Sequence, residues 1–192
     1  MDDRRAVILE GLNVFRALES FGATLYAVWA ASEPDPRLRA GHLIIAEREA
    51  YHARLLTDRI RALGGEPGPA CVDGVLAQQL AELKDLQGFV PQLDAFKRVT
   101  ERDRGRMAAC QQALDQGFEA ARQSDPVTHA FLRQIAGEEK VSAQWYRHTY
   151  GEMTGRHPRS DALPTLAPDQ VVRRAESARF TVGEPAACRA TG

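Results

Sequence analysis

Hydrophobic residues recur at helical spacing along most of the chain and predict four long helices. The first is expected over residues 5–31. It must end near Pro34 and Pro36, because proline lacks an amide donor and pushes the residue before it out of helical geometry. The second is expected over residues 36–63, where Gly64 and Gly65 supply a stop. The short turn between them predicts an antiparallel pair.

The pattern changes after the second helix. Residues 66–90 begin with Pro67, Gly68 and Pro69 and contain a shorter helical pattern over residues 75–86, which indicates a crossover. A third long helix is expected from residue 91 to residue 117, or on to residue 123. The fourth begins at Asp125-Pro126, since an aspartate caps a helix and proline suits its first turn, and it runs to about residue 153.

Two antiparallel pairs joined by one long crossover is the connectivity of ferritin-like four-helix bundles, whereas short loops throughout are typical of the simple up-and-down bundle. The sequence therefore predicts an all-α, ferritin-like bundle over residues 1–154, with a short helix in the crossover. Periodicity is lost from Gly155 onward. Residues 155–192 are predicted to form an extended C-terminal tail, and no second domain is expected.

Composition narrows the classes of partner and compartment. The 192 residues carry a net charge of -1 with acidic and basic residues interleaved, so neither nucleic acid nor a membrane surface is expected as a partner. No apolar run approaches the roughly 18 residues of a membrane span, and the charged start argues against a signal peptide. Cys71, Cys110 and Cys188 lack Cys-x-x-Cys spacing, which predicts neither a disulfide scaffold nor a zinc site and favours the cytoplasm.

The candidate chemistry begins with Glu49 and His52, which project from one face of the second helix. Such a pair also arises in charged helices that bind nothing. Glu19, however, stands twelve residues before residue 31, and Glu49 stands twelve or thirteen after the start of its own helix. At about 1.5 Å per residue both lie ~18 Å from the shared turn, so antiparallel packing places Glu19 level with Glu49 and His52. This predicts half of a metal site.

Three segments resemble rubrerythrins over roughly residues 5–152: Glu19-Ser20-Phe21-Gly22-Ala23-Thr24-Leu25-Tyr26, Glu49-Ala50-Tyr51-His52 and Ala136-Gly137-Glu138-Glu139-Lys140-Val141. In that family, glutamates and two histidines hold two iron atoms that react with peroxide or dioxygen. The resemblance implies that Glu19, Glu49, His52 and Glu138 are metal ligands in a non-haem iron oxidoreductase. Rubrerythrins proper also carry a Cys-rich rubredoxin-type module, and this sequence shows no such cysteine pattern. Electrons are therefore expected from a redox partner or a small-molecule substrate.

Two positions depart from the family pattern. Val141 stands where the fourth helix should supply its second histidine. The residue of the third helix that lies level with Glu138 is expected near Gly105 if that helix ends at residue 117. It is expected near Cys110 and Gln111 if the helix continues to residue 121 or 122. Neither level offers a carboxylate, and Glu101 is the nearest glutamate of the expected kind, so it is included as a candidate ligand.

These departures leave several outcomes open. The set could hold a single iron or manganese ion, or a di-iron centre with help from water, Glu101, Glu139 or a substrate. A degenerate site would hold no metal, and the alternative function is a metal-free ferritin-like bundle that acts as a binding or assembly module. We also expect a homo-oligomer, because bundles of this class pair through apolar helix faces.

Overall fold

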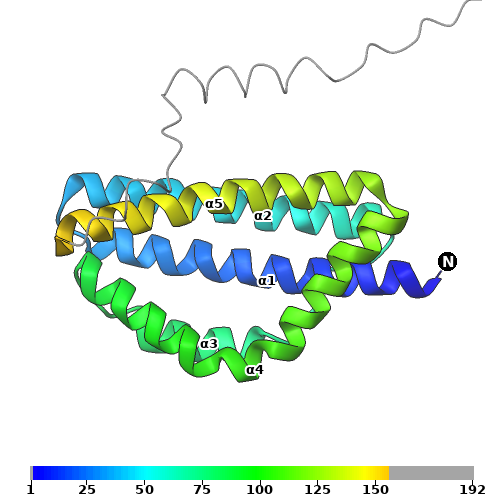
Figure 1. Cartoon of the computed structure of the whole chain (residues 1–192), viewed down its shortest axis with the longest axis horizontal. Helices are drawn as coiled ribbons and strands as arrows, with labels where there is room; N and C mark the ends of the chain where they lie inside the picture. The colour runs from blue at the N-terminus through cyan, green and yellow to red at the C-terminus, as the bar shows by residue number, and fades with distance from the viewer. Residues whose placement is uncertain (1, 156–192) are drawn as a thin grey trace, which may run out of the picture. The chain divides into compact units, whose positions relative to one another are not determined.

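The computed structural model describes residues 2–155, which form five α-helices and no strand (Figure 1). The helices are α1 (Asp2–Ser32), α2 (Pro36–Ala62), α3 (Asp73–Leu83), α4 (Phe89–Ser124) and α5 (Pro126–Thr154). The prediction of an all-α chain is confirmed for this range. Apart from Gly155, the predicted tail lies outside the described residues.

Two aspartates set the helix starts that the proline pattern predicted. The Asp35 side chain accepts hydrogen bonds from the backbone N–H groups of Arg37 (2.8 Å) and Leu38 (3.3 Å) at the start of α2. Asp125 accepts from the backbone N–H of Thr128 (3.0 Å) at the start of α5. Each cap satisfies N–H groups that have no partner within their own helix, and so fixes where the helix begins.

The third long helix follows the longer of the two predicted alternatives. α4 runs to Ser124, and Gly117 lies inside it rather than at its end. The reason is a close helix crossing: a Cβ atom on Gly117 would lie 2.8 Å from the Cα atom of Gly11 in α1. Only glycine allows the two backbones to come this near, so Gly117 serves packing and not termination.

Contacts along the helices fix their relative directions. Near the start of α1, Gly11 meets Gly117 of α4, and near its end Trp29 packs against Phe96. These contacts make α1 and α4 antiparallel. α5 runs in the same direction as α1, because Leu132 shares an apolar cluster with residues near the start of α1, while the Tyr146 ring contacts the Tyr26 ring near its end.

Apolar clusters lie at both ends of the long helices, and another packs the crossover against the middle of α1 and α4. One apolar cluster gathers at the start of α1, and its buried members include Ile8, Leu12, Leu56, Ile60, Leu132 and Ile135. At the opposite end, rings from three other helices surround His42 of α2, namely Trp29, Phe89, Trp145 and Tyr146. Glu19 of α1 lies between these two clusters in the sequence of that helix, and the candidate site lies there.

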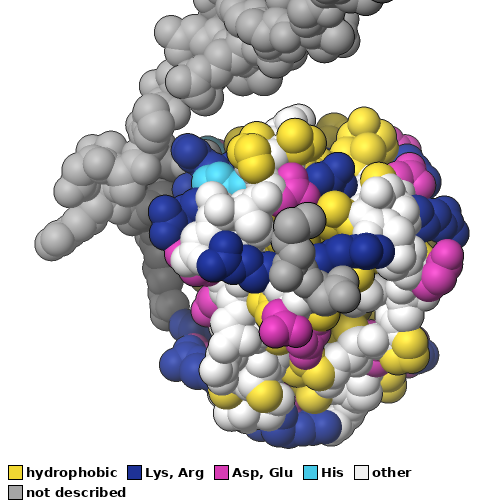
Figure 2. Space-filling view, turned by 90° about the vertical axis from the view of Figure 1, so that its right-hand side faces the viewer, with side chains coloured by type: hydrophobic (Ala, Val, Ile, Leu, Met, Phe, Trp, Pro, Cys, Tyr) yellow, Lys and Arg dark blue, Asp and Glu magenta, His cyan; other side chains and the backbone are white. Residues whose placement is uncertain are grey.

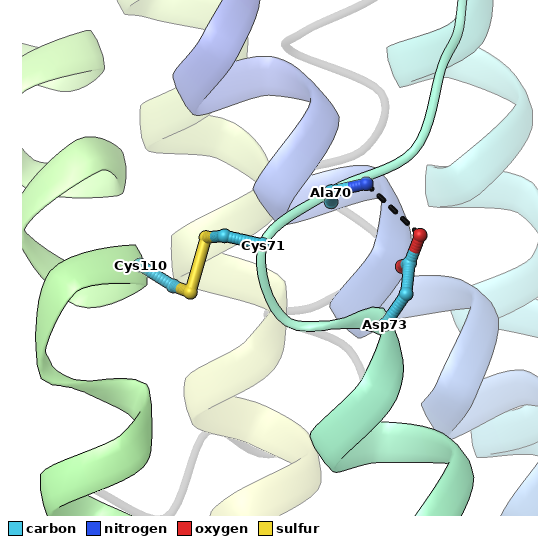
Figure 3. Close-up of a disulfide and its surroundings, with 4 residues drawn as sticks. All are labelled: Ala70, Cys71, Asp73 and Cys110. Atoms are coloured by element: carbon cyan, nitrogen blue, oxygen red, sulfur yellow. Dashed lines mark hydrogen bonds between the residues drawn. A yellow bond between two sulfur atoms is a disulfide. The ribbon is translucent and has the colours of Figure 1, made fainter.

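A disulfide joins Cys71, just before α3, to Cys110 in the middle of α4 (Figure 3). Beside it, Asp73 accepts a hydrogen bond from the backbone N–H of Ala70 (2.9 Å), which shapes the turn into α3. The cysteine spacing, which predicted no disulfide scaffold, therefore did not predict this bond. Spacing along the chain carried no signal, because the fold brings together residues separated by 39 positions. The cysteine residues therefore no longer support the prediction of a reducing cytoplasm.

No helix in the described part of the chain is long and apolar enough to cross a membrane. The end of the molecule shown in Figure 2 carries Lys and Arg side chains among Asp and Glu side chains, with hydrophobic side chains between them. This face therefore shows no extended patch of one charge.

Candidate metal centre

Three helices bring ionisable side chains together around His52. The His52 Nδ1 atom lies 3.2 Å from Glu19 Oε2 and 3.3 Å from Glu139 Oε1. One ligand atom from each of these residues lies within 4.8 Å of the other two. Glu19 and His52 are buried and Glu139 is half-buried. The residues come from α1, α2 and α5, and so the cluster depends on the packing of three helices.

Glu49 belongs to the same buried group. Burial, together with a hydrogen bond to Glu19 and the nearby charges of Glu19 and Glu139, raises the pKa of Glu49 to about 10. Its Oε1 atom is buried and has no hydrogen-bond partner among the described residues. Gly22, one turn after Glu19, makes room for it, since a Cβ atom there would lie 3.0 Å from Glu49 Oε2. Without a metal, Glu49 is therefore a neutral acid.

His52 is the cation of this group. Burial alone would lower the pKa of His52, but hydrogen bonds with Glu139, Glu19 and Glu138 together raise it to about 10. The protonated ring has a single N–H at Nδ1, which faces both Glu19 and Glu139 at similar distances. One donor cannot serve two carboxylates well. A metal ion in its place could bind oxygen from both.

Glu138 contacts the opposite side of the same ring. Its Oε2 atom lies 2.8 Å from His52 Nε2, and its Oε1 atom accepts a hydrogen bond from Gln134 (3.2 Å). Burial alone would raise the pKa of Glu138, but these hydrogen bonds lower it. The structure therefore brings Glu139, rather than the predicted Glu138, to the Nδ1 side. Glu138 has the position of a carboxylate that orients a metal-bound histidine through its other nitrogen.

The predicted ligand Glu101 does not join the cluster. Its side chain is exposed on α4, while the buried acid of that helix is Asp103. Asp103 accepts hydrogen bonds from Arg102 (2.7 Å) and from Gln79 of α3 (3.0 Å), and these hold the pKa of Asp103 well below its usual range. The carboxylate of Asp103 is thus engaged by α3 and its own neighbour.

The remaining departure also follows from helix register. Val141 is 54% exposed, so the position expected for a second histidine points away from the cluster.

The residues of α4 that line a common cavity with Glu19 include Met107, Ala108 and Gln111. This is the level that the sequence predicts when α4 continues past residue 120, and none of these side chains is a carboxylate. The described cluster thus has no ligand from α4.

Sequence reasoning missed Arg48, which precedes Glu49 on α2. Its charge acts electrostatically on Glu49 and Glu138. Its Nε and Nη2 atoms are buried without a hydrogen-bond partner in the described range. An arginine in a charged helix is typical of a solvated face, so nothing in the sequence marked this position. The positive charge stabilises ionised carboxylates nearby and opposes a second cation.

A large cavity extends from the cluster along α1 and α4. Its volume is about 1260 Å³, and Glu19, Glu49 and Glu139 form part of its wall. The cluster is therefore open on the side where α4 contributes no ligand.

The donor set suits one metal ion. A single imidazole nitrogen with several carboxylate oxygens is the ligand class of iron and manganese, and the buried, unpartnered Glu49 Oε1 is an oxygen that a cation would satisfy. A second ion would need further anionic oxygen and nitrogen ligands. Neither Glu101 nor residue 141 supplies them, because both face away from the cluster.

No protein-family model matches the chain, and the comparisons with curated proteins and with solved structures found no match. The resemblance to rubrerythrins therefore rests on the sequence segments that carry it.

Proposed function

We propose that the chain is a ferritin-like four-helix bundle that binds one iron ion and acts as a non-haem oxidoreductase on dioxygen or peroxide. The observation that carries this proposal is the convergence of Glu19, His52 and Glu139, from three helices, within 4.8 Å of one another. The connectivity supports it, because the pair α1 and α2 and the pair α4 and α5 are joined by a crossover that contains α3.

Each residue has a distinct role in this proposal. Glu19, Glu49 and Glu139 would supply oxygen ligands, and His52 would supply nitrogen from Nδ1. Glu138 would accept the Nε2–H hydrogen bond and so fix the orientation of the ring. An iron ion held here supplies one-electron redox chemistry and open coordination positions. Its electrons would come from a redox partner or a small-molecule substrate.

Tyr26 would keep its proton beside this centre. Burial, followed by the negative charges of Glu49, Glu139 and Glu19, raises the pKa of the Tyr26 hydroxyl well above its usual value. The hydroxyl therefore stays neutral at physiological pH and remains a hydrogen-bond donor toward the cavity that it lines.

One observation favours the second candidate, a metal-free bundle used as a binding or assembly module. Protonated Glu49 and protonated His52 already offset much of the acidic charge, because Glu49 hydrogen-bonds to Glu19 and His52 contacts three carboxylates. Buried charges that compensate one another in this way can persist without an ion.

Metal analysis separates the two candidates. After anaerobic loading with ferrous iron and removal of excess, we expect about one equivalent of iron per chain, since a buried set of one nitrogen and three oxygen ligands binds tightly. His52→Ala should abolish binding, while His148→Ala, at an exposed histidine of α5, should not. Less than about a tenth of an equivalent in the unaltered chain would refute the metal-binding proposal.

A further inference from the structure

We infer that the cavity beside the cluster binds an anionic amphiphile, a medium-length apolar chain or ring system that ends in a carboxylate. The carboxylate would pair with Arg104 of α4, and the apolar end would face Glu19 and Glu139. The inference rests on the proposed function only in treating the metal cluster as the reactive end, because binding of the amphiphile itself requires no metal.

The size and walls of the cavity indicate an apolar ligand. Its volume of about 1260 Å³ exceeds the roughly 300–1,000 Å³ of ordinary small-molecule pockets. The apolar wall residues from α1, α3 and α4 include Phe15, Leu18, Phe21, Leu76, Phe96 and Met107. Apolar surface that is buried against such walls contributes about 25 cal/mol of favourable free energy per Å². This is sufficient to hold a chain of ten carbons.

The charges along the α4 wall indicate an anionic end. The two acids there are engaged within their own helix, since Asp115 accepts a hydrogen bond from Gln111 and Glu119 pairs with Arg122. Arg104 also lines the cavity and has no hydrogen bond or ion pair with any described residue. Arg104 is therefore a cation without a hydrogen-bond or ion-pair partner among the described residues, and its guanidinium favours a carboxylate in bidentate geometry.

The carboxylates of the cluster indicate the orientation. Glu19 and Glu139 line the cavity beside His52, and their negative charges would repel a carboxylate placed against them. The head group is thus held at Arg104, and the carbon chain points toward the cluster. This orientation would present a C–H bond, rather than an acid, to the proposed iron.

A comparison of three ligands of equal chain length tests the charge. Decanoate, decanol and decylamine are titrated against the full chain, with displacement of the fluorescent probe anilinonaphthalene sulfonate as the readout. We expect decanoate to bind at least about tenfold more tightly than decylamine, the value of one charge-assisted contact. Equal or tighter binding of decylamine would overturn the inference, as would failure of decanoate to displace the probe.

Adjacent alanines on α4 give a matched pair that tests the location. Ala108 and Ala109 are both exposed, but only Ala108 lines the cavity. Ala108→Trp should occupy part of the cavity and weaken decanoate and decanol alike by about tenfold or more, whereas Ala109→Trp should change neither. Equal effects of the two variants would place the ligand elsewhere.

Arg104→Gln tests the head group. It should weaken decanoate about tenfold and leave decanol unchanged, because only the charge-assisted contact is lost. An equal loss for both ligands would contradict the assigned pairing. These measurements use metal-free protein, while iron content is measured separately on each variant. A chain that binds decanoate but no iron would refute the proposed function alone, and the reverse would refute this inference alone.

Discussion

Glu138 and Glu139 are neighbours in the sequence, yet they meet His52 from opposite sides of its ring. Helix register explains the difference. The buried residues of α5 follow a spacing of four and three, at Thr128, Leu132, Ile135, Ser142, Tyr146 and Thr149. Glu139 falls in this row and Glu138 falls beside it. The large members of this row, Leu132, Ile135 and Tyr146, were visible in the sequence, so periodicity could have selected Glu139 where motif resemblance selected Glu138.

The two glutamates should therefore differ in their effect on iron binding. We expect Glu139→Gln to lower iron affinity by about a hundredfold or more, because it removes a charged ligand oxygen, and Glu138→Gln to lower it by about tenfold through loss of ring orientation. Calorimetric titration with ferrous iron measures both variants. A larger loss in Glu138→Gln would mean that the ligand roles are reversed.

Iron binding should also release protons. Glu49 and His52, each with a pKa of about 10, hold protons at pH 7 in the metal-free chain. Both must lose them to act as ligands, so affinity should rise with pH, by up to about a hundredfold per pH unit near neutrality for two protons. Calorimetry in buffers of different ionisation enthalpy counts the protons. Binding that is independent of the buffer would contradict these protonation states.

His42 should make the fold sensitive to acid. Its Nδ1 atom lies 2.9 Å from the Tyr146 hydroxyl, and burial lowers the pKa of His42 to about 4. The unfolded chain binds the proton at about pH 6.5, so this stabilisation is present above that pH and is lost as pH falls toward 4. Urea unfolding at several pH values should show stability falling by on the order of 3 kcal/mol across this range.

His42→Gln provides the control for this acid sensitivity. The variant lacks the titrating ring, so its free energy of unfolding should depend less steeply on pH between 6.5 and 4, whatever its absolute stability. Equal slopes for the two proteins would assign the acid sensitivity to other groups.

At the scale of the helices, local signals predicted boundaries well and the position of α4 poorly. Proline, glycine and capping aspartates act on the adjacent backbone, so the starts and ends of α2 and α5 could be read directly. The placement of α4 depends on long-range packing. One of its faces lines the cavity with glutamines, including Gln111, Gln112, Gln116 and Gln123. Because that face is polar, the hydrophobic pattern of α4 is weak. In the sequence, Gly117 therefore resembled the residue at which the helix ends.

Two glycines of α4 should respond oppositely to alanine. Gly117→Ala should lower the free energy of unfolding by about 1–3 kcal/mol, because its Cβ atom would meet the Gly11 backbone. A Cβ atom at Gly105 would meet nothing within 4 Å. Gly105→Ala should therefore stabilise the helix by up to about 1 kcal/mol. Thermal unfolding measures both. A destabilised Gly105→Ala or a neutral Gly117→Ala would mean that α4 packs differently against α1.

At the scale of the whole molecule, the sequence predicted the number of long helices and the crossover, because each arises from periodicity and from loop length. It could not predict which side of the cluster stays open, since that depends on how α4 passes α1. Nor could it predict that Cys71 meets Cys110, because the contact follows from the docking of the crossover on α4.

The sulfur bond changes the topology of the chain. Residues 71–110 become a closed covalent ring that holds α3 and more than half of α4, with a sequence separation of 39 between its ends. In the chain-entropy description, a ring of this size removes about 4 kcal/mol of disorder from the unfolded state. A single backbone cut in the connection between α3 and α4 would leave both fragments linked. The wall of the cavity is thus held to the crossover by connectivity as well as by packing.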